Sequence, residues 1–201
     1  MTLINFKYLT WRFSEMEKIE WDKVKTRLDA LLVIDEYQTD PDKNWLRLIV
    51  KSEESYGIRY LIDNGSGDSL DVIFTDKMIF VKGFDHESNL SQFAADEWNQ
   101  DVIDGFYKGL DEKYQNLYSE EQKDETTFFI WYDGQEHQNQ DQDQNQDGGE
   151  WLLSYFFESF ERFQEFVTDY YSITVDENLL RKLYNQGHLS GLELEQLIST
   201  S

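Results

Sequence analysis

An Asp-His-Glu triplet is the first place in this chain where the residue types could do chemistry. Asp85, His86 and Glu87 follow the apolar run MIFVKGF. A histidine beside carboxylates can act as a general base or as a metal ligand. Adjacent residues on an extended chain point in opposite directions, so the three side chains reach one substrate only if the chain turns sharply. Structural hydrogen bonding of the loop, or contact with a partner, is the alternative interpretation.

A second polar cluster, DNGSGD, precedes the same apolar region. Asp63, Asp68 and Asp71 surround Gly65 and Gly67, and together they offer the oxygen ligands that Ca²⁺ prefers. The spacing is not that of an EF-hand, and the distal bidentate Glu is missing. We therefore expect neither a metal nor another cofactor and interpret the segment as a solvated turn, with these three carboxylates as the alternative metal ligands.

The apolar runs between the two clusters predict a β-hairpin. Residues 70–75 and 78–84 are rich in β-branched and aromatic side chains and turn near Asp76 and Lys77. One face of this hairpin would hold Leu70, Val72, Phe74, Ile79 and Val81, and the other Ile73, Met78 and Phe80. Because both faces are apolar, we expect the hairpin in the middle of a sheet, covered on both sides. DNGSGD precedes its first strand and GFDHES follows its second, so both clusters should emerge at one sheet end.

Other segments complete an α+β pattern. Strand composition occurs at 3–13, 45–50, 57–62 and 126–132. The predicted fold is therefore α+β, with a central antiparallel sheet of about four to six strands, flanking helices and a helical C-terminal region.

The predicted helices have apolar stripes and capping signals. Apolar residues between Trp21 and Leu32 recur at steps of three and four. Helical spacing resumes over residues 89–118, where Trp98 is the first residue of the stripe. Capping residues are expected in the C-terminal region at Ser159, at Asp176, and at Ser190 with Glu193.

The composition changes sharply near residue 135. The run QEHQNQDQDQNQD has no apolar residue, which is typical of a disordered low-complexity insertion. We therefore predict an α/β core over 1–134, a disordered Gln/Asp-rich insertion over 135–149 and a helical tail over 150–201. The tail is expected to pack on the core, so that the chain forms a single domain overall.

Charge restricts the class of protein. The chain has 41 Asp and Glu against 18 Lys and Arg, a net charge of −23, and no Cys. A negative surface repels nucleic acids and anionic membranes and attracts basic partners. No apolar run has the length of a membrane span, and none of the motifs GxSxG, P-loop, GxGxxG or HExxH is present. We expect a cytoplasmic protein that binds neither nucleic acid nor membrane.

Four blocks occur in a distinctive order: IDNGSGD, VKGFDHES, TTFFIWYDG and FVTDYYSITVDENLLRKLY. Over roughly residues 57–198, apart from the insertion between Gly134 and Gly148, they resemble a family of uncharacterised bacterial proteins. Proteins of this kind resemble the small acidic immunity proteins of bacterial toxin systems. The resemblance implies no catalytic residues.

Charge and resemblance together lead to the hypothesis of a non-enzymatic acidic binding protein, such as an immunity protein that neutralises a basic toxin, for example a nuclease. An acidic face raises the encounter rate with a basic cleft and competes with its phosphate substrate. The predicted partner-binding residues are Asp85, His86, Glu87, Asp63, Asp68, Asp96 and Glu97. Two alternatives stay open: a metal-dependent or acid/base enzyme using the DNGSGD and GFDHES loops, and a nucleic-acid mimic that blocks a DNA-binding protein.

Overall fold

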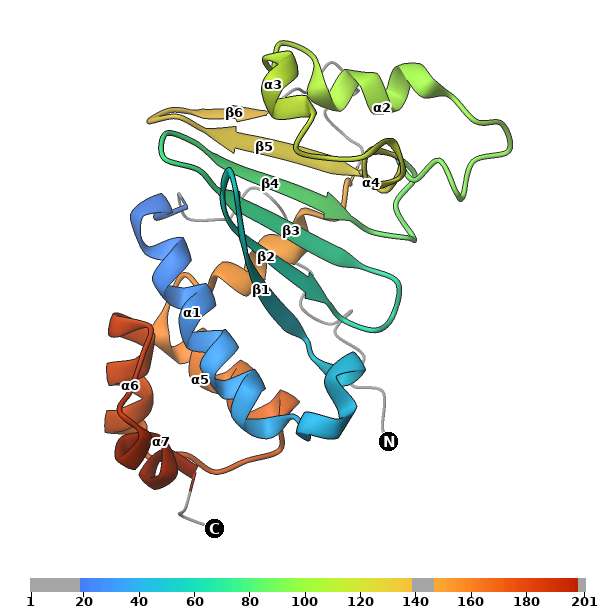
Figure 1. The fold of residues 1–201 in the computed structure, drawn as a ribbon. Coiled ribbons are helices and arrows are strands. Elements are labelled where there is room, and N and C mark those ends of the chain that lie inside the picture. The colour runs from blue at the N-terminus through green and yellow to red at the C-terminus, as the bar shows by residue number, and fades with distance from the viewer. Residues whose placement is uncertain (1–18, 139–146, 199–201) are drawn as a thin grey trace. The chain divides into compact units, whose positions relative to one another are not determined.

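The fold is α+β, as predicted. A computed structural model describes residues 19–138 and 147–198, so the strand expected at 3–13 lies outside the described residues. The chain divides into two compact units, one of Met1–Arg47 with Leu153–Ser201 and the other of Leu48–Leu152. The second unit holds the sheet and three short helices, and the described part of the first unit is helical (Figure 1).

The sheet has six antiparallel strands in sequential order, which agrees with the predicted four to six. Its strands are β1 (Ile49–Glu54), β2 (Gly57–Asp63), β3 (Ser69–Phe74), β4 (Ile79–Phe84), β5 (Phe128–Tyr132) and β6 (Glu136–Gln138). Because each strand pairs with the one before it, β3 and β4 lie in the middle of the sheet (Figure 1). This is the position that their two apolar faces predicted.

The β3–β4 hairpin has the predicted register. Thr75 holds the turn, since its backbone N–H donates to the carbonyl oxygen of Met78 at 2.9 Å and its Oγ1 accepts from Met78 N at 3.0 Å. Two directly opposed pairs define the register: Val72 with Val81, and Ile73 with Phe80. All four side chains are fully buried, so both faces of the hairpin are covered.

One face of the sheet carries an aromatic core. Three helices follow β4 in the chain: α2 (Gln100–Tyr107), α3 (Glu112–Gln115) and α4 (Glu120–Asp124). The core between these helices and the sheet includes Ile73, Phe80, Phe129 and Trp131 from the strands and Ile103, Phe106, Tyr107, Leu110 and Tyr118 from the helical segment. Full burial of an apolar side chain of this size contributes about 1.5–3 kcal/mol, so this cluster holds the helices on the sheet.

The same face also carries three charged residues, of which Asp71 and Lys82 are buried and Arg59 is partly buried. Asp71 is almost completely buried, and Arg59 donates to both of its carboxylate oxygens, with Nε at 2.9 Å from Oδ1. Lys82 lies opposite Asp71 in the β3–β4 register and donates through Nζ to the carbonyl oxygen of Glu125. Burial lowers the pKa of Lys82. The carboxylate of Asp71 is thus neutralised by a partner from the neighbouring strand, which such a buried charge requires.

The first unit is built from capped helices. Its elements are α1 (Trp21–Gln38), the 3₁₀ helix η3 (Pro41–Leu46), α5 (Phe160–Tyr170), α6 (Glu177–Gln186) and α7 (Gly191–Ile198). A further 3₁₀ helix, η4 (Glu150–Phe156), contains the boundary between the two units. The predicted caps are confirmed: Ser159 caps α5, Asp176 caps α6, and Ser190 with Glu193 forms the capping box of α7.

Two predicted elements begin elsewhere in the structure. The strand predicted at 45–50 is wrong at its start, because Asp40 and Pro41 open the 3₁₀ helix η3 and Trp45 is 77% exposed. Helix α2 begins at Gln100, after the prediction, because the Asn99 side chain accepts the N–H of Asp101 and caps the helix. Trp98 therefore precedes the helix instead of starting its apolar stripe.

The range predicted as a disordered insertion is partly strand. Residues 136–138 form β6, which pairs with β5, and the ring of His137 stacks on Trp131 at 5.4 Å. Backbone pairing supplies the stability that the missing apolar side chains could not. The compact units also differ from the predicted domains, because α1 belongs with the C-terminal helices and the sheet unit extends to Leu152. The packing of the helical tail on the sheet stays a prediction.

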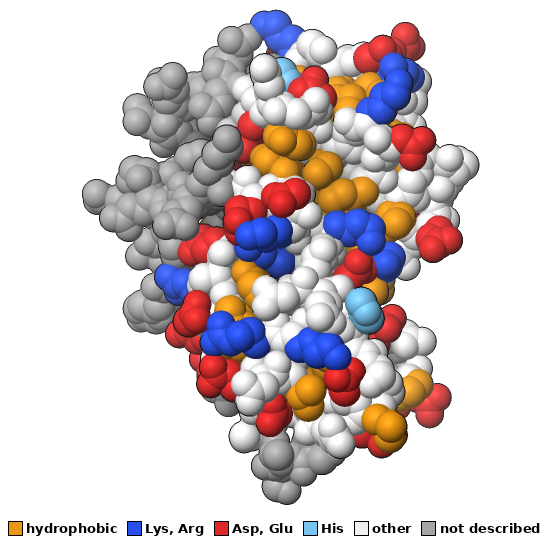
Figure 2. Space-filling view, turned by 90° about the vertical axis from the view of Figure 1, so that its left-hand side faces the viewer, with side chains coloured by type: hydrophobic (Ala, Val, Ile, Leu, Met, Phe, Trp, Pro, Cys, Tyr) orange, Lys and Arg blue, Asp and Glu red, His pale blue; other side chains and the backbone are white. Residues whose placement is uncertain are grey.

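The surface mixes charges of both signs. On the face drawn in Figure 2, Lys and Arg side chains lie among Asp and Glu, and hydrophobic side chains gather in its upper half. Among the coloured side chains of this view, Asp and Glu therefore do not form one continuous patch. None of the helices in the described ranges is long and apolar enough to cross a membrane.

The Arg59–Asp71 pair gives a test of the sheet. Asp71→Leu leaves a partly buried guanidinium without its carboxylate, so we expect a loss of about 3 kcal/mol in the free energy of unfolding, measured by urea titration. The double variant Arg59→Met with Asp71→Leu removes both charges and should lose less than the single variant. If the loss of unfolding free energy in the double variant equals the sum of the losses in Arg59→Met and Asp71→Leu, this account of the buried pair is contradicted.

Candidate functional site

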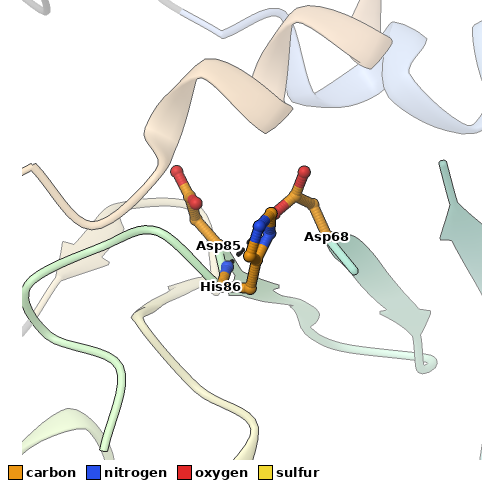
Figure 3. A group of neighbouring side chains, drawn as sticks. All are labelled: Asp68, Asp85 and His86. Atoms are coloured by element: carbon orange, nitrogen blue, oxygen red, sulfur yellow. Dashed lines mark hydrogen bonds and ion pairs between the residues drawn. The ribbon is translucent and has the colours of Figure 1, made fainter. Parts of the chain in front are cut away.

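The β2–β3 loop and the turn after β4 meet at one end of the sheet, as predicted. The carboxylate of Asp68 accepts a hydrogen bond from the backbone N of His86 at 3.1 Å, and the same oxygen lies 2.7 Å from His86 Nδ1. Figure 3 shows the imidazole standing between the side chains of Asp68 and Asp85. Two segments that are separate in sequence therefore form one polar site.

A tight turn brings Asp85 to the same site. The N–H of Ser88 donates to the carbonyl oxygen of Asp85 at 3.1 Å, and the N–H of Glu87 donates to its Oδ1 at 2.9 Å. The other oxygen, Oδ2, accepts from the indole Nε1 of Trp151 at 2.9 Å. The backbone N–H of Asp85 donates to Thr127 Oγ1 at 2.9 Å. This is the sharp turn that lets adjacent residues face one site, and it holds the Asp85 carboxylate from two sides.

Asp68 is fixed by its own loop. Asn64 Nδ2 donates to Asp68 Oδ2 at 2.8 Å, and Asn64 Oδ1 accepts from the backbone N–H groups of Ser66 at 2.8 Å and Asp68 at 3.3 Å. These are the side-chain-to-backbone bonds by which Asn and Asp stabilise turns. Asp68 is buried, so its carboxylate is held in one position.

Two glycines let the chain approach the site closely. Gly149 has φ +88°, and a Cβ there would lie 2.3 Å from the Cβ of Asp85. Gly67 has φ +100°, and a Cβ there would lie 3.3 Å from His86 Nδ1. Any side chain at Gly149 would displace Asp85, so this approach requires glycine.

The site favours a charged imidazole. The hydrogen bond that His86 donates to the Asp68 carboxylate raises the pKa of His86, and the nearby carboxylates of Glu87 and Asp85 act in the same direction. The His86 side chain is 47% exposed, so it stays within reach of solvent. An imidazolium held by a carboxylate and open to water can serve as a proton donor or as a charged contact for a partner.

The site also has ligand types that suit a divalent cation. One ligand atom each from Asp68, Asp85 and His86 lies within 4.8 Å of the others. Imidazole and carboxylate ligands suit first-row transition metals. The structure does not group the alternative metal ligands Asp63, Asp68 and Asp71: Asp71 binds Arg59 on the sheet face, and Asp63 accepts from Gly65 N at 2.8 Å. Only Asp68 of that set belongs to the group.

The other predicted partner-binding residues are exposed. Asp63 is the last residue of β2, and Glu87 lies in the turn after β4. Asp96 and Glu97 lie farther along, in the segment between β4 and α2. None of these four joins the ligand group of Asp68, Asp85 and His86.

Three aromatic residues near the site were not predicted as functional. The rings of Phe84 and Phe93 contact edge to face at 5.9 Å, and Phe93 and Trp98 do so at 5.6 Å. Phe93 is 61% exposed and Trp98 47%. The sequence signal for the exposure of Trp98 was Asn99, a residue type that favours the N-cap position of a helix. With Asn99 as the cap of α2, Trp98 lies before the helix and not on its buried face.

The two segments that meet at this sheet end are poor in basic residues. No Lys or Arg occurs in residues 60–76 or 83–107, whereas Asp and Glu occur repeatedly in both ranges. Lys82, at the border of the second range, is buried. Apart from His86, the side-chain charges within these two ranges are therefore all negative.

The chain was compared with known proteins. No family model, no curated protein and no solved structure matches it. The geometry and charge of the site therefore carry the functional argument.

The pKa shift of His86 predicts a pH-dependent stability. A histidine whose folded pKa is raised contributes stability that is fully present below its unfolded pKa of about 6.5 and is lost as pH rises through the folded pKa. Because half of the imidazole is exposed, we expect His86→Asn to destabilise by only about 1 kcal/mol near pH 5.5, and by less near pH 9. Urea titrations across this range measure the difference.

The matched control is His188→Asn. The ring of His188 faces the carbonyl oxygen of Gln186 at 2.9 Å instead of a carboxylate. The same titrations of this variant measure how the loss of an imidazole outside the site affects stability. An effect of His86→Asn that grows as pH rises would have the wrong sign and would contradict the ion pair.

Proposed function

We propose that this protein is a non-enzymatic binding protein for a basic protein partner, and that the partner belongs to the class of toxins with a cationic cleft, such as nucleases. The observation that carries the proposal is the convergence at one sheet end of two polar segments without Lys or Arg. Long-range attraction of a basic partner requires such a negative region.

Charge acts here mainly through the rate of encounter. Clefts or loops of one sign raise association rates by about 10–10³-fold at low salt. Asp63, Glu87, Asp96 and Glu97 are exposed and lie in or beside the two segments without Lys or Arg, so they are the carboxylates that a partner can reach. A cationic cleft that binds phosphate groups would be attracted to the same carboxylates, and the bound protein would exclude the substrate.

Rigidity supports binding more than catalysis. Both oxygens of Asp85 and both oxygens of Asp68 already accept hydrogen bonds from the chain. Fixed carboxylates lose little conformational entropy when a partner binds. The same bonds leave the carboxylates less available as general bases than free side chains would be.

The proposal predicts a salt-sensitive complex with one basic protein. We expect affinity purification from the native host at low ionic strength to recover a single basic partner and to lose it in high salt. Neutralising four carboxylates should slow association with that partner roughly tenfold. This site variant combines Asp63→Asn, Glu87→Gln, Asp96→Asn and Glu97→Gln.

The matched control removes the same charge elsewhere on the sheet unit. It combines Glu53→Gln, Glu54→Gln, Asp76→Asn and Glu112→Gln, all at exposed positions. Stopped-flow association should be changed less than about twofold in this variant. Recovery of no basic partner would contradict the proposal, and equal slowing in both variants would remove this sheet end from it.

A metal-dependent role is the second candidate, favoured by the ligand group of Asp68, Asp85 and His86. A divalent cation and a proton would compete for His86 Nδ1, so binding should strengthen as pH rises. Calorimetric titration with Zn²⁺ and Mn²⁺ tests it, comparing Asp85→Asn with the exposed control Asp63→Asn. Heat of binding that Asp85→Asn abolishes and Asp63→Asn preserves would support a metal site; no binding in the wild-type protein would exclude it.

A further inference from the structure

The strongest unassigned feature of the surface is the aromatic loop, residues 88–99 between β4 and α2. In Figure 1 this segment extends well away from the sheet before the chain enters α2. Its two exposed aromatic side chains, Phe93 and Trp98, contact each other edge to face, with ring planes at 82°. Because the two rings are in contact, they form one continuous apolar area, and such areas are a feature of interaction sites.

The base of the aromatic loop is anchored in the protein core. Leu90 belongs to the buried aromatic core of the sheet unit, and Gln92 is also buried. Gln92 Oε1 accepts from Asn99 N at 2.8 Å, and Gln92 Nε2 donates to the carbonyl oxygen of Leu90 at 3.3 Å. The side chain of Gln92 therefore closes the loop, with Phe93 and Trp98 lying between its two ends.

Further bonds leave the rings ready for contact. Ser88 Oγ accepts from Leu90 N at 3.1 Å, and the indole Nε1 of Trp98 lies 3.2 Å from Gln100 Oε1. Because the indole N–H already has a partner, the exposed part of Trp98 is mostly its apolar ring. A surface ordered before binding loses less entropy than one that folds around its partner.

The charge around the rings selects the partner. Asp96 and Glu97 lie within the same exposed loop, and Asp101 follows at the start of α2. With no Lys or Arg in residues 83–107, no cation of this segment can neutralise them. Aromatic faces and carboxylates together favour arginine, whose planar guanidinium stacks on rings and also binds carboxylates.

We propose that Phe93 and Trp98 are the apolar centre of the docking surface for the basic partner, which inserts a segment with arginine next to an aliphatic side chain. The inference rests on the proposed function and names the part of the surface that supplies most of the affinity. Large aromatic side chains ringed by polar groups are typical binding hot spots. A second copy of this chain fits worse, because it would bring the same carboxylates face to face.

The test compares peptides of matched charge. The probes are a twelve-residue peptide of alternating Arg and Leu, one of alternating Arg and Ser, and one of alternating Lys and Leu. Binding is measured by calorimetry with the full-length protein at about 0.15 M salt. This salt concentration screens non-specific attraction of the cationic peptides to a protein with a net charge of −23. We expect the Arg and Leu peptide to bind most tightly, and Phe93→Ala with Trp98→Ala to weaken it roughly tenfold.

Trp45→Ala is the matched control. Trp45 is more exposed than Trp98 but lies in η3, with Lys43 and Arg47 on either side of it in the sequence, so it is an exposed Trp outside the aromatic loop. This variant should bind the Arg and Leu peptide as the wild-type protein does. The milder variant Trp98→Phe keeps an aromatic ring and should keep most of the affinity, while circular dichroism verifies that each variant is folded.

The outcomes separate this inference from the proposed function. If the Phe93→Ala and Trp98→Ala variant binds every peptide like the wild-type protein, the aromatic docking surface is overturned, although the four-carboxylate variant can still show that charge drives association. If the wild-type protein forms a dimer that the same two substitutions dissolve, a second copy occupies the surface and the inference is also overturned. The partner recovered from the native host then replaces the peptides, and the same loss of affinity is expected.

Discussion

The register between β3 and β4 is the constraint on which the rest of the sheet unit depends. The turn closed by Thr75 and Met78 sets Ile73 opposite Phe80 on one face and Val72 opposite Val81 on the other. A shift of one residue would turn the side chains of one strand to the opposite face and break these pairs. The register also decides which residues emerge at the far end of the hairpin.

Buried charge reinforces that register. Asp71 on β3 lies opposite Lys82 on β4 and binds Arg59 from β2, so three neighbouring strands are joined across one face. A slipped strand would leave the Asp71 carboxylate buried without its guanidinium, at a cost of several kcal/mol. These buried polar contacts therefore favour one register of the strands. Apolar packing alone would distinguish less strongly between this register and a shifted one.

The surface at the hairpin end follows from this arrangement. The polar site combines Asp68 from the β2–β3 loop with Asp85 and His86 from the turn after β4. The aromatic loop continues from the same turn, and the contact of Phe84 with Phe93 ties it to the end of β4. Fixed carboxylates and an exposed aromatic pair are thus carried by one rigid sheet end. This combination is the basis of the proposal that charge attracts a basic partner and that the aromatic pair then contacts it.

Sequence periodicity was sufficient to predict the α+β class, the central hairpin with its two faces, and the meeting of the DNGSGD and GFDHES loops. The reason is that side-chain alternation and the position of a turn depend on residues that are neighbours in the sequence. It could not place Asp71, whose carboxylate looked like a loop ligand until the register set it beside Arg59. Nor could it show that Trp98 is exposed, since helical spacing continues across the cap at Asn99. Contacts such as Trp151 with Asp85 join residues far apart in the chain. Their distances depend on how the strands and loops pack, so only the tertiary structure decided which carboxylates form the site and which aromatic rings face solvent.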